Sequence, residues 1–112
     1  MTVNKKIIQA LNFLKIPVRE SFYDGDDVEY ITFETPFSNG ADYGDDEPGE
    51  VVTEAKIHWW LPMKKNYLTD KKRIRKALFD AGFTFPSAEV IPDPDSSIRH
   101  ILFECEIEEE EN

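Results

Sequence analysis

The first apolar positions of the chain follow the repeat of a helix. They recur at spacings of three and four residues: Val3, Ile7, Ile8, Leu11 and Leu14. Such spacing lines one face of a helix with apolar side chains. Thr2 or Asn4 can cap its start, and Pro17 disfavours helical backbone at the residue before it. We therefore predict a helix that begins near Val3 and ends near Lys15.

Two short runs of extended character follow, separated by a strong turn signal. The runs cover residues 18–23 and 28–35, and a turn sequence of Asp and Gly occupies residues 24–27. This arrangement is typical of a β-hairpin, so two strands joined by that turn are predicted. Residues 37–50 are rich in glycine and acidic side chains, and we expect them to form a long mobile loop.

The second half of the chain alternates more regularly. Residues 51–61 place every second side chain on one face, as in a half-buried strand: Thr53, Ala55, Ile57, Trp59 and Leu61. A second helix is predicted after Pro62, with Gly82 as its stop. Its apolar stripe is Leu68, Ile74, Ala77, Leu78 and Ala81. An extended piece over residues 83–91 and a last strand over residues 98–107 complete the pattern.

The order of these elements favours an α+β fold. Most connections are short, and strand-helix-strand repeats are few, so we predict a mostly antiparallel sheet of about four to five strands with two helices packed on one face. One domain is expected over residues 1–107, with the mobile acidic loop at about residues 37–50. Residues 108–112 contain no apolar side chain and are expected to form a disordered acidic tail.

Composition supports a folded domain and disfavours non-specific binding to nucleic acid or membranes, although a local basic patch could still act. The 112 residues are 40% hydrophobic and include eight Phe, four Tyr and two Trp, enough large side chains for one core. The net charge of −10 disfavours attraction to nucleic acid or anionic lipid. The sequence contains no apolar run long enough for a membrane span and no apolar segment typical of a signal peptide, so we expect a cytoplasmic protein.

The sequence offers few groups for catalysis or for binding a metal or cofactor. His58 and His100 are predicted to lie on strands, on the faces opposite their core stripes, and an ordinary cross-strand pair explains them better than proton transfer does. Cys105 points away from the face of His100 by strand parity, which disfavours a metal site. The acidic loop lacks the full spacing of a calcium loop, and the glycines form no phosphate-binding motif. We therefore predict a non-enzymatic protein without cofactor or metal.

The second helix carries a cluster of basic side chains for which three interpretations remain open. Seven of the thirteen Lys and Arg residues fall between Lys64 and Lys76, near Trp59, Trp60 and Tyr67. The cluster could be a solvated helix face or a surface for single-stranded nucleic acid. We favour a third interpretation, in which the basic helix of one subunit complements the acidic loop and tail of the next in a head-to-tail ring. Trp60 would suit an anchor of such an interface, although burial under the second helix or the loop is an equal alternative.

Several short motifs, in order and spacing, resemble a family of small tail components of tailed bacteriophages and prophages. This family includes tail terminator and tail completion proteins, and the resemblance spans almost the whole chain. Its motifs are IPV (16–18), FYDG (22–25), YITF (30–33), ADYGDDE (41–47), IHWW (57–60), LFDAGF (78–83) and ILFE (101–104). The acidic residues 108–111 are not part of the pattern.

The resemblance implies a structural virion or prophage protein. Its subunits would form a ring, expected to be a hexamer, at the head-facing end of the tail tube, and would contact tail-tube and head-tail connector proteins. They would be present in the bacterial host cytoplasm during assembly and then in the virion tail. The family offers no functional residue set to transfer, so interface residues are predicted from charge and exposure: Trp60, Lys71, Lys72, Arg73, Arg75, Lys76, Tyr43, Asp45, Asp46 and Glu47. The alternative is an acidic adaptor or inhibitor that binds a host protein, with the acidic surface mimicking nucleic acid.

Overall fold

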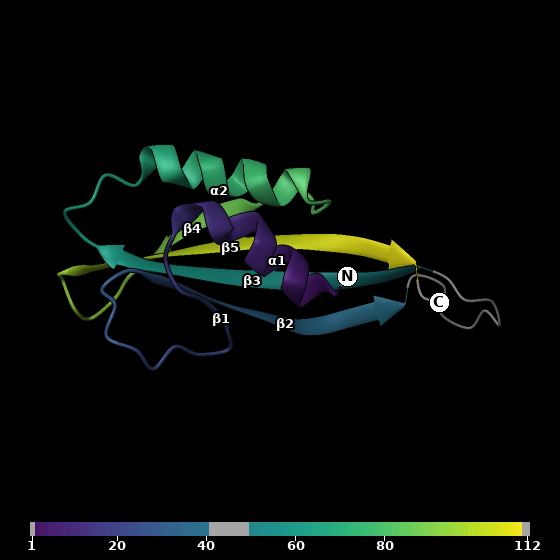
Figure 1. Ribbon diagram of the computed structural model, residues 1–112, viewed down its shortest axis with the longest axis horizontal. Helices are drawn as coiled ribbons and strands as arrows, with labels where there is room; N and C mark the ends of the chain where they lie inside the picture. Colours follow the sequence, from purple (N-terminus) through teal and green to yellow (C-terminus); the bar gives the residue numbers. More distant parts are fainter. Residues whose placement is uncertain (1, 41–49, 111–112) are drawn as a thin grey trace.

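A computed structural model describes residues 2–40 and 50–110 as one sheet with two helices (Figure 1). The elements in chain order are α1 (Val3–Leu11), the 3₁₀ turn η1 (Asn12–Leu14), β1 (Val18–Glu20), β2 (Tyr30–Gly40), β3 (Glu50–Pro62), α2 (Leu68–Asp80), β4 (Ser87–Ile91) and β5 (Ile98–Glu110). The five strands are arranged β1-β2-β3-β5-β4. Three of the four strand pairs are antiparallel, so the predicted α+β class with a mostly antiparallel sheet is confirmed.

The predicted hairpin between the first two strands is wrong. β1 pairs with β2 in parallel, with Val18 opposite Ile31 and Glu20 opposite Phe33. Ser21 has a positive φ of 70°, which turns the chain out of the strand directly after Glu20. The turn sequence at residues 24–27 therefore belongs to a longer connection that carries the chain back to the start of β2.

Both helices pack on one face of the sheet, as predicted. Ile7 and Leu11 of α1 and Ile74 and Leu78 of α2 are fully buried, at the spacings that the sequence pattern indicated. The strand side chains that meet them are Ile31, Phe33, Ala55, Ile57, Trp59, Leu61, Ile101, Phe103, Cys105 and Ile107. All of these strand residues lie on the same face by register, so the other face of the sheet has no helix against it.

The helix ends agree with the local sequence signals. The Thr2 hydroxyl accepts a hydrogen bond from the Lys5 amide at 3.2 Å and caps α1. The Asn66 side chain accepts one from the Leu68 amide at 3.0 Å, where α2 begins. Gly82 follows α2 with a φ of 110°, a conformation that glycine adopts without strain. The sequence therefore determines where α2 begins and ends.

The strands are longer than the predicted loop and tail allowed. β2 continues to Gly40 and β3 begins at Glu50, so both ends of the predicted loop at 37–50 are strand, while residues 41–49 lie outside the described part of the chain. β5 continues to Glu110, so residues 108–110 of the predicted disordered tail pair with β3. Backbone pairing with β3 accounts for a strand that side-chain polarity alone does not predict. Figure 1 shows β2, β3 and β5 extending past the ends of the helices, and the molecule measures 52 × 25 × 23 Å.

Candidate interaction surfaces

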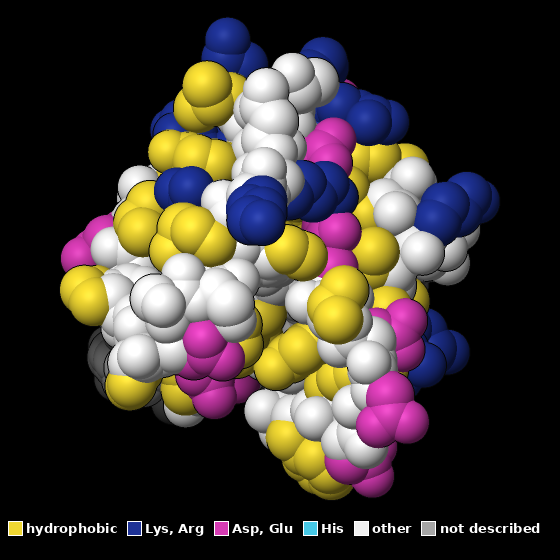
Figure 2. Space-filling view, turned by 90° about the vertical axis from the view of Figure 1, so that its left-hand side faces the viewer, with side chains coloured by type: hydrophobic (Ala, Val, Ile, Leu, Met, Phe, Trp, Pro, Cys, Tyr) yellow, Lys and Arg dark blue, Asp and Glu magenta, His cyan; other side chains and the backbone are white. Residues whose placement is uncertain are grey.

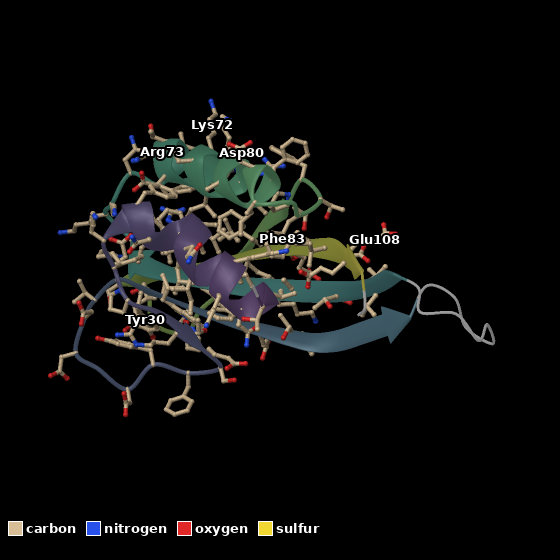
Figure 3. The ribbon with its side chains drawn as sticks, turned by 45° about the vertical axis from the view of Figure 1, so that its right-hand side comes forward. Tyr30, Lys72, Arg73, Asp80, Phe83 and Glu108 are labelled. Carbon is tan, nitrogen blue, oxygen red and sulfur yellow. The ribbon has the colours of Figure 1, made fainter. Side chains whose placement is uncertain are left out.

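The outer side of α2 presents a strongly basic surface, which we call the basic face: Lys71, Lys72, Arg73, Arg75 and Lys76. Burial of Ile74 and Leu78 directs these side chains away from the core. Figure 3 shows Lys72 pointing away from the sheet, and Lys and Arg side chains gather in the upper half of Figure 2. The helix carries only two acidic residues against these five cations. Five of the seven cations in the predicted cluster therefore share α2, whereas Lys65 lies in the turn before it and pairs with Glu29.

Members of the basic face differ in how firmly they are held. Arg75 donates to the Pro86 carbonyl at 2.8 Å, and its guanidinium lies 4.4 Å from the ring centroid of Phe85. Arg73 lies 4.6 Å from the ring of Phe13 and pairs with Asp70 at 3.2 Å. Lys72 is exposed and has no acidic partner among the residues that the structure describes. Lys72 is therefore the cation most available to a partner.

A half-buried carboxylate, Glu29, ties the start of α2 to the sheet. Glu29 accepts a hydrogen bond from the indole nitrogen of fully buried Trp59 at 2.9 Å. Lys65, in the turn between β3 and α2, donates to both oxygens of Glu29 at 2.6 and 2.8 Å and approaches Asp70 at 3.6 Å. This arrangement fixes the position of the turn and hence the direction in which the basic face points.

The helix-free face of the sheet carries a row of stacked rings. Tyr23, Tyr30, Trp60 and His100 follow one another with centroid separations of 4.7, 5.2 and 4.5 Å. These residues come from the β1–β2 connection, β2, β3 and β5, which places the row across the strands. Trp60 is half-buried within this row, and Figure 3 shows Tyr30 on the side of the sheet away from α2. Trp60 is therefore not covered by α2 and is not adjacent to the basic face.

The two histidines are neighbours on this face, as strand parity suggested. His58 Nδ1 and His100 Nε2 are 2.9 Å apart, and His58 Nε2 lies 3.2 Å from a Glu34 oxygen. Burial is the larger cause that lowers the pKa of His100, and the charge of His58 is the smaller one. The carboxylate of Asp93 opposes this shift. The pair lies among aromatic rings, and Thr32 lies directly opposite His58 across the strands. The ring nitrogens that make hydrogen bonds have each other and Glu34 as partners. The ordinary cross-strand interpretation therefore accounts for the geometry.

A hollow of about 400 Å³ opens beside the ring row. Its lining is mainly apolar: Asp27, Val28, Tyr30, Trp60, Pro62, Ser97 and Ile98. It lies at the end of the molecule that faces the viewer in Figure 2, where apolar side chains are visible below the basic ones. Val28 at its rim is 76% exposed. An exposed apolar side chain beside aromatic rings is a feature of protein contact surfaces.

Towards the other end of the helix-free face, acidic side chains line β3 and β5. We call Glu54, Glu104, Glu106 and Glu108 the carboxylate stripe. Glu54 lies directly opposite Glu106, and only Glu104 faces a cation, Lys56, across the strands. Like charges directly opposite each other in a sheet are destabilising. This stripe was not predicted, because it depends on the register between β3 and β5, although the alternating glutamates at 104, 106 and 108 were a sequence signal for it.

The predicted interface residues therefore do not form one site. The five basic residues share α2, whereas Trp60 lies across the sheet from them. The remaining predicted residues, Tyr43, Asp45, Asp46 and Glu47, lie outside the described residues, as does the acidic loop considered for calcium.

Within residues 2–40 and 50–110, no group of His, Cys, Asp and Glu side chains is arranged to hold a metal ion. Burial raises the pKa of the Cys105 thiol to about 12, which keeps the sulfur protonated and makes it a poor metal ligand or nucleophile. No helix in this part of the chain has the length and apolar character needed to cross a membrane.

Comparison with known proteins finds likeness in structure but not in sequence. No family model matches the chain, and no curated protein matches its sequence. Among solved structures, a chain of the virion of a native gene transfer agent (GTA) particle has a similar fold, with a TM-score of 0.63. The match covers 97% of this chain and 95% of that chain at 14% sequence identity. The two chains therefore share a fold from end to end.

Proposed function

We propose that this protein is a structural, non-enzymatic component of a phage or prophage tail, which assembles into a ring and docks to tail-tube or head-tail connector proteins. The observation that supports this most strongly is the fold shared, over nearly the full length of both chains, with a chain of the GTA virion. The tail-protein motifs in the sequence agree with the same class of particle. Residues 108–110, outside those motifs, belong to β5 and extend the sheet that such an assembly could use.

The surfaces of the molecule suit assembly better than catalysis. The groups with the most reactive potential, the two histidines and Cys105, are stacked among rings or buried. In contrast, the basic face, the ring row and the carboxylate stripe are large surface features with no internal role that requires their exposure. Arg and Trp side chains are common in the contacts that dominate binding energy, and both occur here.

Localisation in particles tests this proposal. A tagged copy of the chain would be expressed in the bacterial strain that carries its gene, particle production induced, and purified particles probed with gold-labelled antibody by electron microscopy. We expect label at the head-proximal end of the tail, and we expect deletion of the gene to leave heads and tails unjoined or tails of irregular length. Absence of the chain from purified particles, with normal particles after deletion, would contradict the proposal.

One observation favours a second candidate, an acidic adaptor or inhibitor that mimics nucleic acid. The carboxylate stripe places glutamates at regular spacing along a strand, as a phosphate backbone places its charges. An adaptor of this kind would stay monomeric and would capture a DNA-binding host protein in a complex that salt dissociates. Sizing of the purified chain at low and high salt separates this candidate from a self-assembling subunit.

A further inference from the structure

The described residues carry two surfaces of opposite charge that do not meet within one chain. The basic face lies on α2, and the carboxylate stripe lies on the helix-free face of β3 and β5. No ion pair joins a member of one to a member of the other. In Figure 3, Lys72 and Arg73 lie on top of α2, whereas Glu108 lies beyond the C-terminal end of that helix.

The helix-free face has an excess of negative charge that the chain itself does not balance. By register, its carboxylates include Glu34, Glu54, Glu89, Glu104, Glu106 and Glu108, whereas its cations within residues 2–40 and 50–110 are Arg19 and Lys56. Glu54 and Glu106 face each other directly, so an added cation between them would relieve repulsion. The basic face has the opposite excess, and Lys72 is exposed with no ion-pair partner among residues 2–40 and 50–110.

We propose that the helix-free face of the sheet is a docking surface for a second copy of this chain, whose basic face on α2 packs against the carboxylate stripe. This inference rests on the proposed self-assembly and names the surfaces that carry it. The acceptor is the sheet surface that β3 and β5 form on the helix-free face. Charge complementarity favours a copy of this chain, because the surface that fits the stripe is already present on every subunit.

The contact would join two different surfaces, so each subunit would offer its α2 to one neighbour and its sheet to another. Such a head-to-tail contact closes into a ring when the rotation between neighbours permits, and otherwise continues as a filament. A standard interface buries roughly 800 Å² on each partner, so the contact would extend beyond the stripe along β3 and β5, which run for 13 residues each. The ring row beside the stripe adds apolar and aromatic area to the same face.

A charge-exchange experiment tests this arrangement. Glu106→Lys alters only the stripe, and since it places a cation opposite Glu54 we expect it to fold normally. Lys72→Glu alters only the basic face, at an exposed side chain that forms no ion pair within the described part of the chain. Asp24→Lys and Lys5→Glu make the same charge changes at exposed positions outside both surfaces and serve as matched controls. Circular dichroism would verify that all variants are folded.

Self-association would be measured by sedimentation from about 0.01 M salt, where charges act over roughly 30 Å, to about 1 M, where they act over roughly 3 Å. We expect the wild-type chain to form oligomers that dissociate as salt rises. Each single variant should associate about tenfold more weakly, and the controls should match the wild type. The chain that carries both Glu106→Lys and Lys72→Glu should recover association, because the charges are exchanged across the same contact.

Three results would overturn the inference: single variants that associate like the wild type, a double variant weaker than either single variant, or a wild-type chain that remains monomeric at low salt while it binds a basic protein. The last result would identify a basic partner other than this chain as the occupant of the stripe. Gold labelling of particles made with each variant separates this inference from the proposed function. Equal incorporation of all variants would overturn the docking surface alone, whereas absence of the wild-type chain from particles would overturn the proposed function.

Discussion

Glu29 accepts hydrogen bonds from Trp59 of β3 and from Lys65 in the turn before α2, and its replacement should destabilise the whole domain. In Glu29→Ala the indole N–H of Trp59 loses its recorded acceptor while remaining in a fully buried side chain. Lys65 loses both contacts to Glu29 and keeps only Asp70, at 3.6 Å. The change thus removes a partly buried hydrogen bond and an ion pair without creating a large cavity.

The expected cost follows from the burial of each partner. An unsatisfied buried donor costs about 1–3 kcal/mol. The Lys65 side chain is 36% exposed, so loss of its ion pair adds only about 0.2–1 kcal/mol. We therefore expect Glu29→Ala to lower the free energy of unfolding by about 2–3 kcal/mol. For a domain of this size the loss corresponds to a fall in melting temperature of roughly 10 °C.

Urea unfolding followed by far-ultraviolet circular dichroism would measure this effect, because the signal does not depend on the two tryptophans. Glu20→Ala is the matched control. That carboxylate accepts one exposed hydrogen bond, from Asn4 at 2.7 Å, so its loss should cost less than about 0.5 kcal/mol. In the Trp59→Phe background, which has no indole donor at position 59, Glu29→Ala should lower the free energy of unfolding by about 1–2 kcal/mol less than in the wild type.

A free energy of unfolding for Glu29→Ala within about 0.5 kcal/mol of the wild-type value would show that Glu29 does not stabilise the domain. Additive losses of unfolding free energy in Glu29→Ala and Trp59→Phe would show that the carboxylate and the indole are not energetically coupled, which would also contradict the prediction.

Three further predictions concern single sites. Because the pKa of His100 is lowered from 6.5 by burial and by His58, and only partly restored by Asp93, the unfolded chain binds more protons. The free energy of unfolding should therefore be complete above pH 6.5 and decrease as pH falls below it. His100→Phe should reduce the dependence of unfolding free energy on pH in urea titrations, and equal dependence in both proteins would contradict the prediction. Cys105, with a pKa of about 12, should have about one thiol in ten thousand ionised near pH 8 and react with a disulfide reagent only when urea unfolds the chain; rapid labelling of the native protein would argue against burial. Gly82→Ala should cost about 1–2 kcal/mol in thermal melts because φ is 110°, whereas a loss below about 0.3 kcal/mol would show that the turn adapts.

The periodic parts of the sequence predicted their own structure well. In β3, the side chains of Ile57, Trp59 and Leu61 are buried as their alternation indicated, because strand parity alone assigns them to one face. In α2, the buried residues Ile74 and Leu78 lie four apart, as the helical repeat requires. These assignments need only local geometry, so they did not depend on knowing which segments meet.

Predictions that depended on pairing were less successful. The turn sequence at residues 24–27 suggested a hairpin. Instead, β1 pairs in parallel with β2, with Val18 opposite Ile31, and no local sequence signal indicates this pairing. Likewise, the polar residues 108–110 appeared unable to form structure, yet their backbone pairs with Val52, Val51 and Glu50 of β3. Backbone hydrogen bonds do not depend on side-chain polarity, so composition underestimated the length of β5.

The sequence by itself determined the α+β class, both helices, the two faces of the long strands and the basic character of α2, because each follows from spacing along a continuous stretch of chain. Only the tertiary structure decided the strand order, the parallel placement of β1 and the position of Trp60 across the sheet from α2. It also decided that Glu54 faces Glu106 and forms a carboxylate stripe. These features arise where segments distant in sequence come into register. One register is favoured because it buries the apolar face of every strand in the same core, which no single segment determines.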